Sequence, residues 1–568
     1  MDMASSTATR DAPDGDSALV KDLVIVGAGP AGLYQLYKAR EIGLDAVVVE
    51  RGGGVGGTWY WNRYPGLVVD APSFDYSYSF SPELEQEWEW STWYPSQPEV
   101  LSYLEHVAER FDLLKDIRLN TAVVGAQWQA DEGRWVVELA DGGTISTRFC
   151  VMATGCLSEP RAPEIDGVDT FAGRVLHTGT WPHEAVDFVG KRVGIVGTGS
   201  SGVQTLPVVA QTAASVTLFQ RTPGFSVPAR NRPLTEEETA EVKATYRARR
   251  EQTRHSPGGL LFPPAEKSVF EATPEERQAR FERYWELGWP VTLTYTDVST
   301  DKAANDIVAD FVRSKIREIV QDPERADLLT RQDYPIGTKR IILDTNYYDT
   351  FNRDNVDLVD VRTTPIVSID RDGVNTTDAH YDVDILIFAT GFDAITGALL
   401  AMDIVGEQGV RLRDEWAAGP RTYLGLSVAH FPNLFLATGP GSPSVISNVF
   451  VSIEQHIEWF SDLFAHMRDH NLATVVATVD AQDDWVSTVN AVAARTLYPT
   501  AASWYMGANV PGKPRVFMPF LGGVGNYRKI CDEVVTDGYR GFVFEPLDAQ
   551  VPDEATARVA DATTAAAR

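Results

Sequence analysis

Two copies of the glycine pattern G-x-G-x-x-G constrain the fold of this chain most, because each follows an apolar run and precedes a helical one. The apolar runs are LVIV before the first copy and RVGIV before the second. The glycines are Gly27, Gly29 and Gly32 in the first copy and Gly197, Gly199 and Gly202 in the second. In a strand-turn-helix unit, such glycines allow a tight turn, close backbone approach to a pyrophosphate and close packing of helix on strand. We therefore expect an α/β protein with two dinucleotide-binding units.

The residue that ends the next strand of each unit predicts which nucleotide is bound. DAVVVE ends at Glu50, whose carboxylate can accept hydrogen bonds from a ribose 2′-hydroxyl. SVTLFQR ends at Arg221, beside the hydroxyl of Thr222, and a cation there suits a 2′-phosphate, although it can also be an ordinary surface charge. The first Rossmann-like domain therefore predicts FAD and the second NADPH. The turn residues predicted to lie near the phosphates are Ala31, Thr198, Ser200 and Ser201.

Composition places the protein among globular chains with more than one domain. Its 568 residues exceed what one hydrophobic core usually supports, and 44% hydrophobic residues suffice for packed cores. A formal net charge of -29 argues against nucleic acid or an anionic membrane as a partner, since phosphate binding depends on Lys and Arg. No apolar run approaches the roughly 18 residues that a membrane span needs.

The cysteines give no sign of a disulfide framework or a metal site. Cys150, Cys156 and Cys531 form no C-x-x-C pair and have no metal-ligand spacing. We therefore expect no bound metal and a reducing, cytoplasmic location.

Two apolar strands that end in Ala-Thr-Gly predict that both domains are discontinuous in sequence. They are FCVMATG, which ends at Gly155, and YDVDILIFATG, which ends at Gly391. Between them, NDIVADFVRSKIREIV has helical periodicity, and we expect Asn305 to cap that helix. The expected division is a disordered tail at 1–20, an FAD-binding domain at 21–155 and 390–546, an NADP-binding domain at 156–225 and 330–389, a helical insertion at 226–329 and a tail at 547–568.

A further pair of patterns links the two units. FAGRVLHTGTWP precedes the second glycine turn and has the form F-x-G-x-x-x-H-x-x-x-W-P, while GTWYWNRYPGLVVD follows the first turn. Over nearly the whole chain these patterns resemble the Baeyer-Villiger flavin monooxygenases, and the loop from Gly441 to Asn448 is similar to that of the phenylacetone and steroid monooxygenase branch. The fingerprint residues are Phe171, Gly173, His177, Trp181 and Pro182, and the second motif contains Gly57, Trp59, Tyr64, Pro65, Gly66 and Asp70.

The resemblance also implies site residues. Those implied for FAD are Thr58, Trp59, Asp70, Tyr76, Val123 and Val449; those for NADP are Lys339, Arg340 and Trp504; and those for the substrate pocket are Ser444, Val445 and Ile446. It implies a hinge and hydrogen-bonding role for His177, not proton transfer. By sequence alone, Tyr76 is equally a strand aromatic, Lys339 with Arg340 a solvated edge, and Trp504 part of a packed surface loop.

One departure from the family concerns the residues before Asp70. Leu67, Val68 and Val69 stand where relatives commonly carry Ala-Arg-Cys. Any polar contact that this arginine makes is therefore missing here, and packing on the nicotinamide side is expected to differ.

Two nucleotide sites in one chain predict hydride transfer from NADPH to the flavin. The reduced flavin must then meet a disulfide, an electron acceptor or oxygen, and no redox-active cysteine pair is present. In the resembled family, a C4a-peroxyflavin attacks a ketone, and the Criegee adduct rearranges to an ester or lactone. Because these species are anionic, we assign the catalytic cation to Arg340, which stays charged, and its orientation to Asp70.

Two other functions remain open from the sequence. A flavin-dependent N- or S-oxygenating monooxygenase shares both glycine turns and differs mainly in the fingerprint. A nucleotide-sensing or scaffold protein without catalysis is the second. The expected partners are a ketone and O2, with no nucleic acid and no membrane, in a monomer or weak homodimer.

Overall fold

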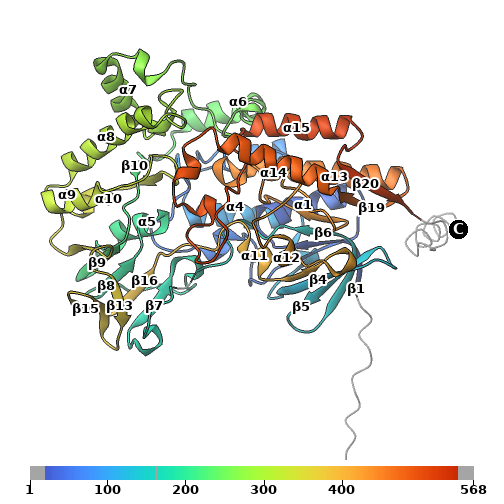
Figure 1. Ribbon diagram of the computed structural model, residues 1–568, viewed down its shortest axis with the longest axis horizontal. Coiled ribbons are helices and arrows are strands. Elements are labelled where there is room, and N and C mark those ends of the chain that lie inside the picture. The colour runs from blue at the N-terminus through green and yellow to red at the C-terminus, as the bar shows by residue number, and fades with distance from the viewer. Residues whose placement is uncertain (1–18, 162, 548–568) are drawn as a thin grey trace, which may run out of the picture.

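The computed structural model describes residues 19–161 and 163–547. The expected tails therefore lie almost wholly outside the described residues, but β1 already begins at Leu19, within the range predicted as tail. Two large sheets occupy the lower left and lower right of Figure 1, and helices α6 to α9 lie above them. The protein has the mixed α/β fold with two Rossmann-like units that the sequence predicts.

The first glycine turn belongs to an eight-stranded sheet. Its central strand β1 pairs in parallel with β2 and β6, as expected for a buried apolar run, whereas β4, β5 and β6 form an antiparallel meander. The strands in spatial order are β17 (Asp403–Val405), β4 (Val123–Gln129), β5 (Arg134–Leu139), β6 (Thr144–Met152), β1 (Leu19–Val26), β2 (Ala46–Val49) and β3 (Ile117–Arg118), with β18 (Leu434–Leu436) paired to β6.

The second glycine turn belongs to a five-stranded, wholly parallel sheet. Its strands in spatial order are β12 (Val356–Asp360), β9 (Ser215–Gln220), β8 (Arg192–Val196), β16 (Ile385–Phe388) and β7 (Arg174–His177). The smaller sheets are β10 (Ser226–Pro228) with β11 (Ile342–Asp344); β13 (Ile366–Ile369) with β14 (Gly373–Thr376) and β15 (His380–Asp382); and β19 (Leu472–Ala477) with β20 (Phe542–Pro546).

Helices cover both sheets. They also form most of the segment at 226–329, which lies in sequence between the two halves of the second unit. They are α1 (Pro30–Glu41), α2 (Thr58–Trp61), α3 (Pro82–Glu87), α4 (Gln97–Arg110), α5 (Ser200–Val209), α6 (Glu236–His255), α7 (Pro274–Leu287), α8 (Lys302–Ile319), α9 (Pro323–Leu329), α10 (Tyr347–Thr350), α11 (Gly397–Leu400), α12 (Leu412–Glu415), α13 (Val449–Asp469), α14 (Val479–Ala493) and α15 (Val524–Thr536).

The prediction that Asn305 caps α8 is wrong. The helix begins one turn earlier, and the Asp301 side chain caps it by accepting a hydrogen bond from the Ala304 N–H. Asn305 is instead fully buried inside the helix, where its amide donates to the carbonyls of Val298 and Ile336. The Asn305 side chain therefore bonds to loop carbonyls and not to the end of the helix.

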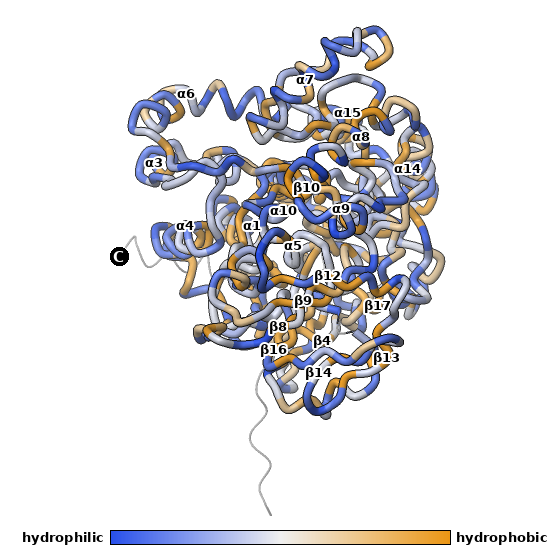
Figure 2. Tube along the Cα trace, turned by 90° about the vertical axis from the view of Figure 1, so that its left-hand side faces the viewer, coloured by the Kyte–Doolittle hydropathy of each residue, from blue (hydrophilic) through white to orange (hydrophobic). Residues whose placement is uncertain are grey.

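Each sheet has its own hydrophobic core. The first core joins β1, β2, α1 and α13 through residues such as Leu23, Val48 and Phe460, and the second joins β8, α5 and α8 through Ile195 and Leu206. Figure 2 shows hydrophobic stretches along β8, β9 and β16 and mainly hydrophilic ones along the outlying helix α6. Three residues of α6 are buried, which agrees with its mainly polar surface.

Helix α6 is held to the first unit by the half-buried Arg249 and the buried Arg250. The Arg249 guanidinium pairs with Asp75, whose side chain is 1% exposed. Arg250 pairs with Glu85 at 2.8 Å and donates to the Ser77 hydroxyl and the Tyr78 carbonyl. These bonds fix the segment around Tyr76, which the family resemblance implies for FAD binding.

We expect Arg250→Ala to lower the free energy of unfolding by about 3 kcal/mol, because it leaves Glu85 charged and unpaired where both side chains are only 9% exposed. Denaturant unfolding followed by circular dichroism measures this loss. Lys302→Ala, which breaks the exposed pair with Asp306, is the control and should cost under about 0.5 kcal/mol. Equal losses in both variants would contradict a special role for the buried pair.

Candidate active site

The first glycine turn presents an open helix end. Gly27 has φ of +107°, and a Cβ there would lie 2.6 Å from the Ala153 carbonyl oxygen. A Cβ on Gly32 would lie 1.8 Å from the Gly27 oxygen, so α1 packs tightly on β1. Gly29 precedes α1 with no side-chain cap, which leaves backbone N–H groups at the helix N-terminus for an anion.

Glu50 is part of the same turn. Its carboxylate is buried and accepts hydrogen bonds from the backbone N–H groups of Ala28 (2.8 Å) and Gly52 (2.7 Å). These bonds hold the carboxylate beside the open helix end, where it borders the cavity. The geometry suits a ribose hydroxyl next to a pyrophosphate.

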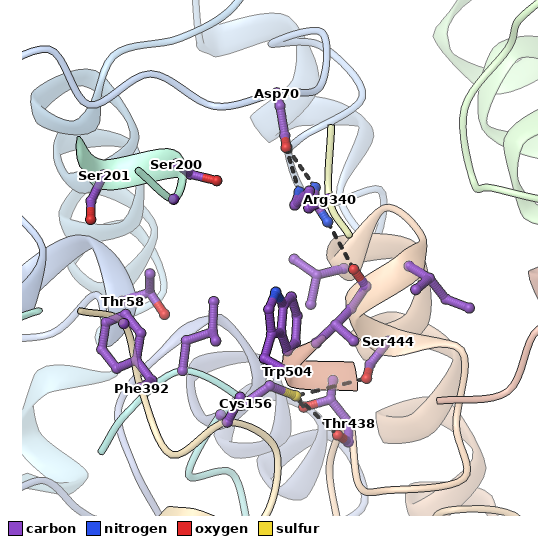
Figure 3. Close-up of a pocket in the computed structure, with 18 of the residues that line it drawn as sticks. Thr58, Asp70, Cys156, Ser200, Ser201, Arg340, Phe392, Thr438, Ser444 and Trp504 are labelled. Carbon is purple, nitrogen blue, oxygen red and sulfur yellow. Dashed lines mark hydrogen bonds and ion pairs between the residues drawn. The ribbon is translucent and has the colours of Figure 1, made fainter. Parts of the chain in front are cut away.

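The second glycine turn repeats this arrangement. Gly197 has φ of +114°, and a Cβ there would lie 2.4 Å from the Ala389 oxygen; a Cβ on Gly202 would lie 2.1 Å from the Gly197 oxygen. Gly199 precedes α5, again without a side-chain cap. Ser200 and Ser201, in the first turn of α5, border the cavity (Figure 3). This turn can therefore hold a second pyrophosphate.

Basic side chains gather beside the second turn. Arg221 and Thr222 follow β9, and the Lys339 ammonium lies 4.2 Å from the centre of the Tyr334 ring. Burial, together with Arg221 and Arg362, lowers the pKa of Lys339, and Asp333 opposes that shift. Arg362, which no sequence pattern suggested, reaches the Thr222 hydroxyl at 3.4 Å.

One cavity of about 1740 Å³ connects both turns. It exceeds the roughly 300–1,000 Å³ of an ordinary ligand pocket, so it can hold more than one ligand. The predicted residues that line it are Gly27, Gly29, Ala31, Glu50, Thr58, Trp59, Asp70, Tyr76, Val123, Val449, Gly197, Thr198, Gly199, Ser200, Ser201, Arg221, Thr222, Lys339, Arg340, Ser444, Val445, Ile446 and Trp504. The helix-packing glycines Gly32 and Gly202 do not line it.

An ion pair faces this cavity. The Arg340 Nε donates to Asp70 Oδ2 at 2.6 Å and its Nη2 to Asp70 Oδ1 at 2.8 Å, while its Nη1 donates to the Val445 carbonyl at 2.8 Å. Figure 3 shows Asp70 above Arg340 and Trp504 below them, with the dashed bond from Arg340 leading to the loop before α13. The pair therefore joins the second motif, the Lys-Arg segment and the predicted substrate loop.

Mutual charge stabilises both members of this pair. The Asp70 carboxylate raises the pKa of Arg340 against the effect of burial. Burial favours the neutral form of Asp70, but the guanidinium outweighs it and holds the pKa of Asp70 below its usual value. Tyr505 adjoins the pair: burial raises the pKa of Tyr505, and Arg340 partly reverses the shift. Arg340 is thus a permanent cation at the cavity wall.

Aromatic and small polar residues complete the wall. Trp59 and Tyr76 meet edge to face with ring centres 5.5 Å apart. Cys156 contacts the Thr438 carbonyl at 3.2 Å and lies 3.7 Å from the Ser444 hydroxyl, below Trp504 in Figure 3. Burial raises the pKa of Cys156, so its thiol is a poor nucleophile.

The five named fingerprint residues lie beside the cavity, and of their segment Gly179 lines it. The segment forms β7 at the sheet edge, and Trp181 is buried in the second core, where Phe188 is partly buried beside it. His177 Nδ1 accepts from the Gly179 N–H at 3.0 Å, and Nε2 lies 3.1 Å from the Arg161 carbonyl. Since that carbonyl requires a donor, Nε2 carries the proton, and burial lowers the pKa of His177. Both ring nitrogens are occupied, which fits a structural role.

Sequence reasoning missed several lining or adjoining residues. The segment PGGLLFPPA (257–265) borders the cavity at Pro257, Leu260 and Phe262. Its apolar side chains on a Gly/Pro-rich stretch were a usable signal, but no motif marked them. Arg362 could have been found because it follows the strand next to β9.

The described residues hold no group of three or more His, Cys, Asp or Glu side chains that could bind a metal ion. Their three cysteines are all free. No helix in the described ranges is long and apolar enough to cross a membrane.

Known proteins resemble this chain over most of its length. A family model described as pyridine nucleotide-disulphide oxidoreductase matches residues 24–255. A Baeyer-Villiger monooxygenase of Pseudooceanicola batsensis is 41% identical, with 92% of this chain and 96% of the relative covered. A solved structure of oxidized steroid monooxygenase bound to NADP is 50% identical with a TM-score of 0.89, covering 93% of this chain and 99% of that one. A phenazine N-monooxygenase of Lysobacter antibioticus is 38% identical over 92% of this chain and 96% of its own length.

We expect Glu50→Gln to weaken FAD binding about tenfold, because an amide cannot accept from both backbone N–H groups that the carboxylate now satisfies. The ratio of flavin to protein absorbance after gel filtration measures the loss. Glu41→Gln, at an exposed position on α1, is the control. Retention of full flavin content by Glu50→Gln would contradict the assignment.

Proposed function

Because this chain belongs to the Baeyer-Villiger flavin monooxygenases, we propose that it converts a ketone into an ester or lactone with NADPH and O2. The observation that carries this proposal is the Arg340–Asp70 pair in the wall of the cavity that connects both nucleotide turns. The fit of both cofactors rests on the open, glycine-lined helix ends, on Glu50 at the first and on Arg221 at the second.

The positions of these residues suggest which of them bind FAD and which bind NADPH. When bound, FAD accepts a hydride from NADPH and, once reduced, activates oxygen. The α1 end and Glu50 hold the first dinucleotide; the α5 end, Arg221, Thr222 and Lys339 hold the second. Tyr76 and Trp59 line the cavity, and they are proposed to shield the flavin from water. The assignment of FAD and NADP residues to the two discontinuous domains named above is part of this proposal.

Arg340 is proposed to stabilise negative charge on the reacting oxygen atoms. Its three hydrogen bonds to Asp70 and Val445 use three of the five N–H donors of a guanidinium, which leaves two for other groups. Asp70 fixes the plane of the guanidinium and keeps it charged. At ~4 Å and an effective dielectric near 20, one charge pair is worth roughly 4 kcal/mol, about a thousandfold in rate.

The substrate is proposed to enter beside the loop of Ser444, Val445 and Ile446 and the segment at 257–265. Because Val445 also accepts a bond from Arg340, the loop connects substrate shape to the position of the cation. We further propose a cytoplasmic protein that acts as a monomer or weak homodimer.

N-oxygenation is the second candidate function. It is favoured by the phenazine N-monooxygenase, whose similarity to this chain approaches that of the ketone-oxidising relatives. Product identity separates the two: mass spectrometry after turnover with a ketone and with an aromatic N-heterocycle should show an ester or lactone, whereas an N-oxide as the main product would replace the proposal.

Arg340→Ala should reduce ester formation about 100-fold or more, while FAD binding and reduction by NADPH persist, because it removes the cation from the reacting oxygens. NADPH consumption should then appear as hydrogen peroxide. Arg340→Lys should rescue poorly, since an ammonium cannot bind Asp70 bidentately. Rapid-mixing spectroscopy with product analysis separates these steps. Arg411→Ala, which breaks a surface pair with Asp403, is the control, and near-normal ester formation by Arg340→Ala would move the catalytic cation elsewhere.

Arg221→Ala should raise the KM for NADPH about tenfold and that for NADH less than twofold, because only NADPH carries the 2′-phosphate. Steady-state kinetics with both nucleotides measures the difference. Equal increases would place the 2′-phosphate site elsewhere.

A further inference from the structure

Four charged side chains lie near one another beyond the carboxyl ends of β9 and β12 in the five-stranded sheet. Strands β9 and β12 are parallel neighbours, with Gln220 opposite Asp360, so the residues that follow them come together. Arg221 and Thr222 follow β9, and Arg362 follows β12. Asp333 and Lys339 reach the same place from the stretch before β11.

Arg362 bridges two partners there. Its Nη2 lies 3.4 Å from the Thr222 hydroxyl oxygen, to which it donates, and 3.2 Å from Asp333 Oδ2. The same guanidinium is close enough to Lys339 to lower the pKa of its ammonium, as Arg221 also does, although burial is the larger cause. The positive charges of the two arginines therefore both act on the lysine ammonium.

This group is unbalanced. Arg221, Lys339 and Arg362 carry three positive charges, and Asp333 is the carboxylate that opposes them at Lys339. Like charges this close repel one another unless an anion lies between them. A phosphate monoester, with a charge near -2, three acceptor oxygens and a neighbouring hydroxyl donor in Thr222, matches the excess.

We infer that Arg362 is a third cation of the 2′-phosphate site and that Asp333 is its exchangeable counter-ion. When NADPH binds, the phosphate replaces Asp333 as the partner of Arg362. The inference rests on the proposed function, in which Arg221, Thr222 and Lys339 hold this phosphate. Exchange is inexpensive because the Arg362 and Asp333 side chains are 44% and 62% exposed, and exposed ion pairs contribute little. Asp333 thus weakens NADPH binding while it partly offsets the positive charge of the site when no phosphate is bound.

The test compares binding of adenosine 2′,5′-bisphosphate with that of 5′-AMP to the FAD-loaded protein by calorimetry. Both probes carry the adenosine and the 5′-phosphate, so their affinity ratio reports the 2′-phosphate alone. If the unaltered protein does not prefer the bisphosphate, the proposed NADPH site itself fails. A preference that persists in every variant below would overturn only the roles of Arg362 and Asp333.

Arg362→Ala should reduce the affinity for the bisphosphate about fivefold to tenfold and leave 5′-AMP unchanged. Arg371→Ala is the control, because it removes an exposed cation of the second unit that faces Asp372 and not this group. Equal losses for both probes, or an equal loss in the control, would overturn the role of Arg362.

Asp333→Asn should instead strengthen bisphosphate binding about twofold to fivefold. Asp327→Asn removes an equally exposed carboxylate that faces Arg317 and serves as its control. In Asp333→Asn combined with Arg362→Ala, most of this gain should vanish, because the counter-ion acts chiefly through Arg362. No gain in the single variant, or an undiminished gain in the double variant, would overturn the exchange.

Discussion

The ion pair between Arg340 and Asp70 is the constraint around which the active cavity is arranged. Its members are 270 residues apart in sequence, and Arg340 also holds the carbonyl of Val445, a further 105 residues along the chain. One guanidinium therefore holds three segments together: the loop after the first glycine turn, the segment before β11 and the substrate loop. The pair explains why an arginine is needed, since a single ammonium could not make three bonds in one plane.

Most of the nucleotide-binding framework was predictable from sequence, because it depends on local backbone geometry. Gly27, Gly197 and Glu50 serve tight turns and backbone N–H groups only a few residues away or on the next strand. The loop at 257–265 and Arg362 were missed because their place in the site depends on which strands and helices become neighbours, and no local pattern reports that. Asn305 was misassigned for a similar reason. Its partners Val298 and Ile336 lie in loops outside the helix, and helix periodicity does not predict where those loops pack.

The helical segment contributes to the site as well as covering it. Arg249 and Arg250 of α6 hold the turn that contains Tyr76, and the residues just after α6 form part of the cavity wall. The Asn448 amide, which precedes α13, donates to the carbonyls of Asp75 and Gly259 and so links the substrate loop to both. The walls on the substrate side and on the flavin side are therefore held by the same buried hydrogen bonds.

The interleaved strand order has a consequence for how the chain is made. β6 receives its partner β18 only after residues 434–436 exist, and β7 and β8 are joined by β16 only after residues 385–388 exist. On the ribosome, neither sheet can close while the first two-thirds of the protein emerges, so apolar strand edges wait unpaired for distant segments. Such non-local pairing slows folding and exposes surfaces that aggregate. Slower synthesis or chaperone capacity, rather than the stability of the finished fold, should therefore govern how much active protein a cell produces.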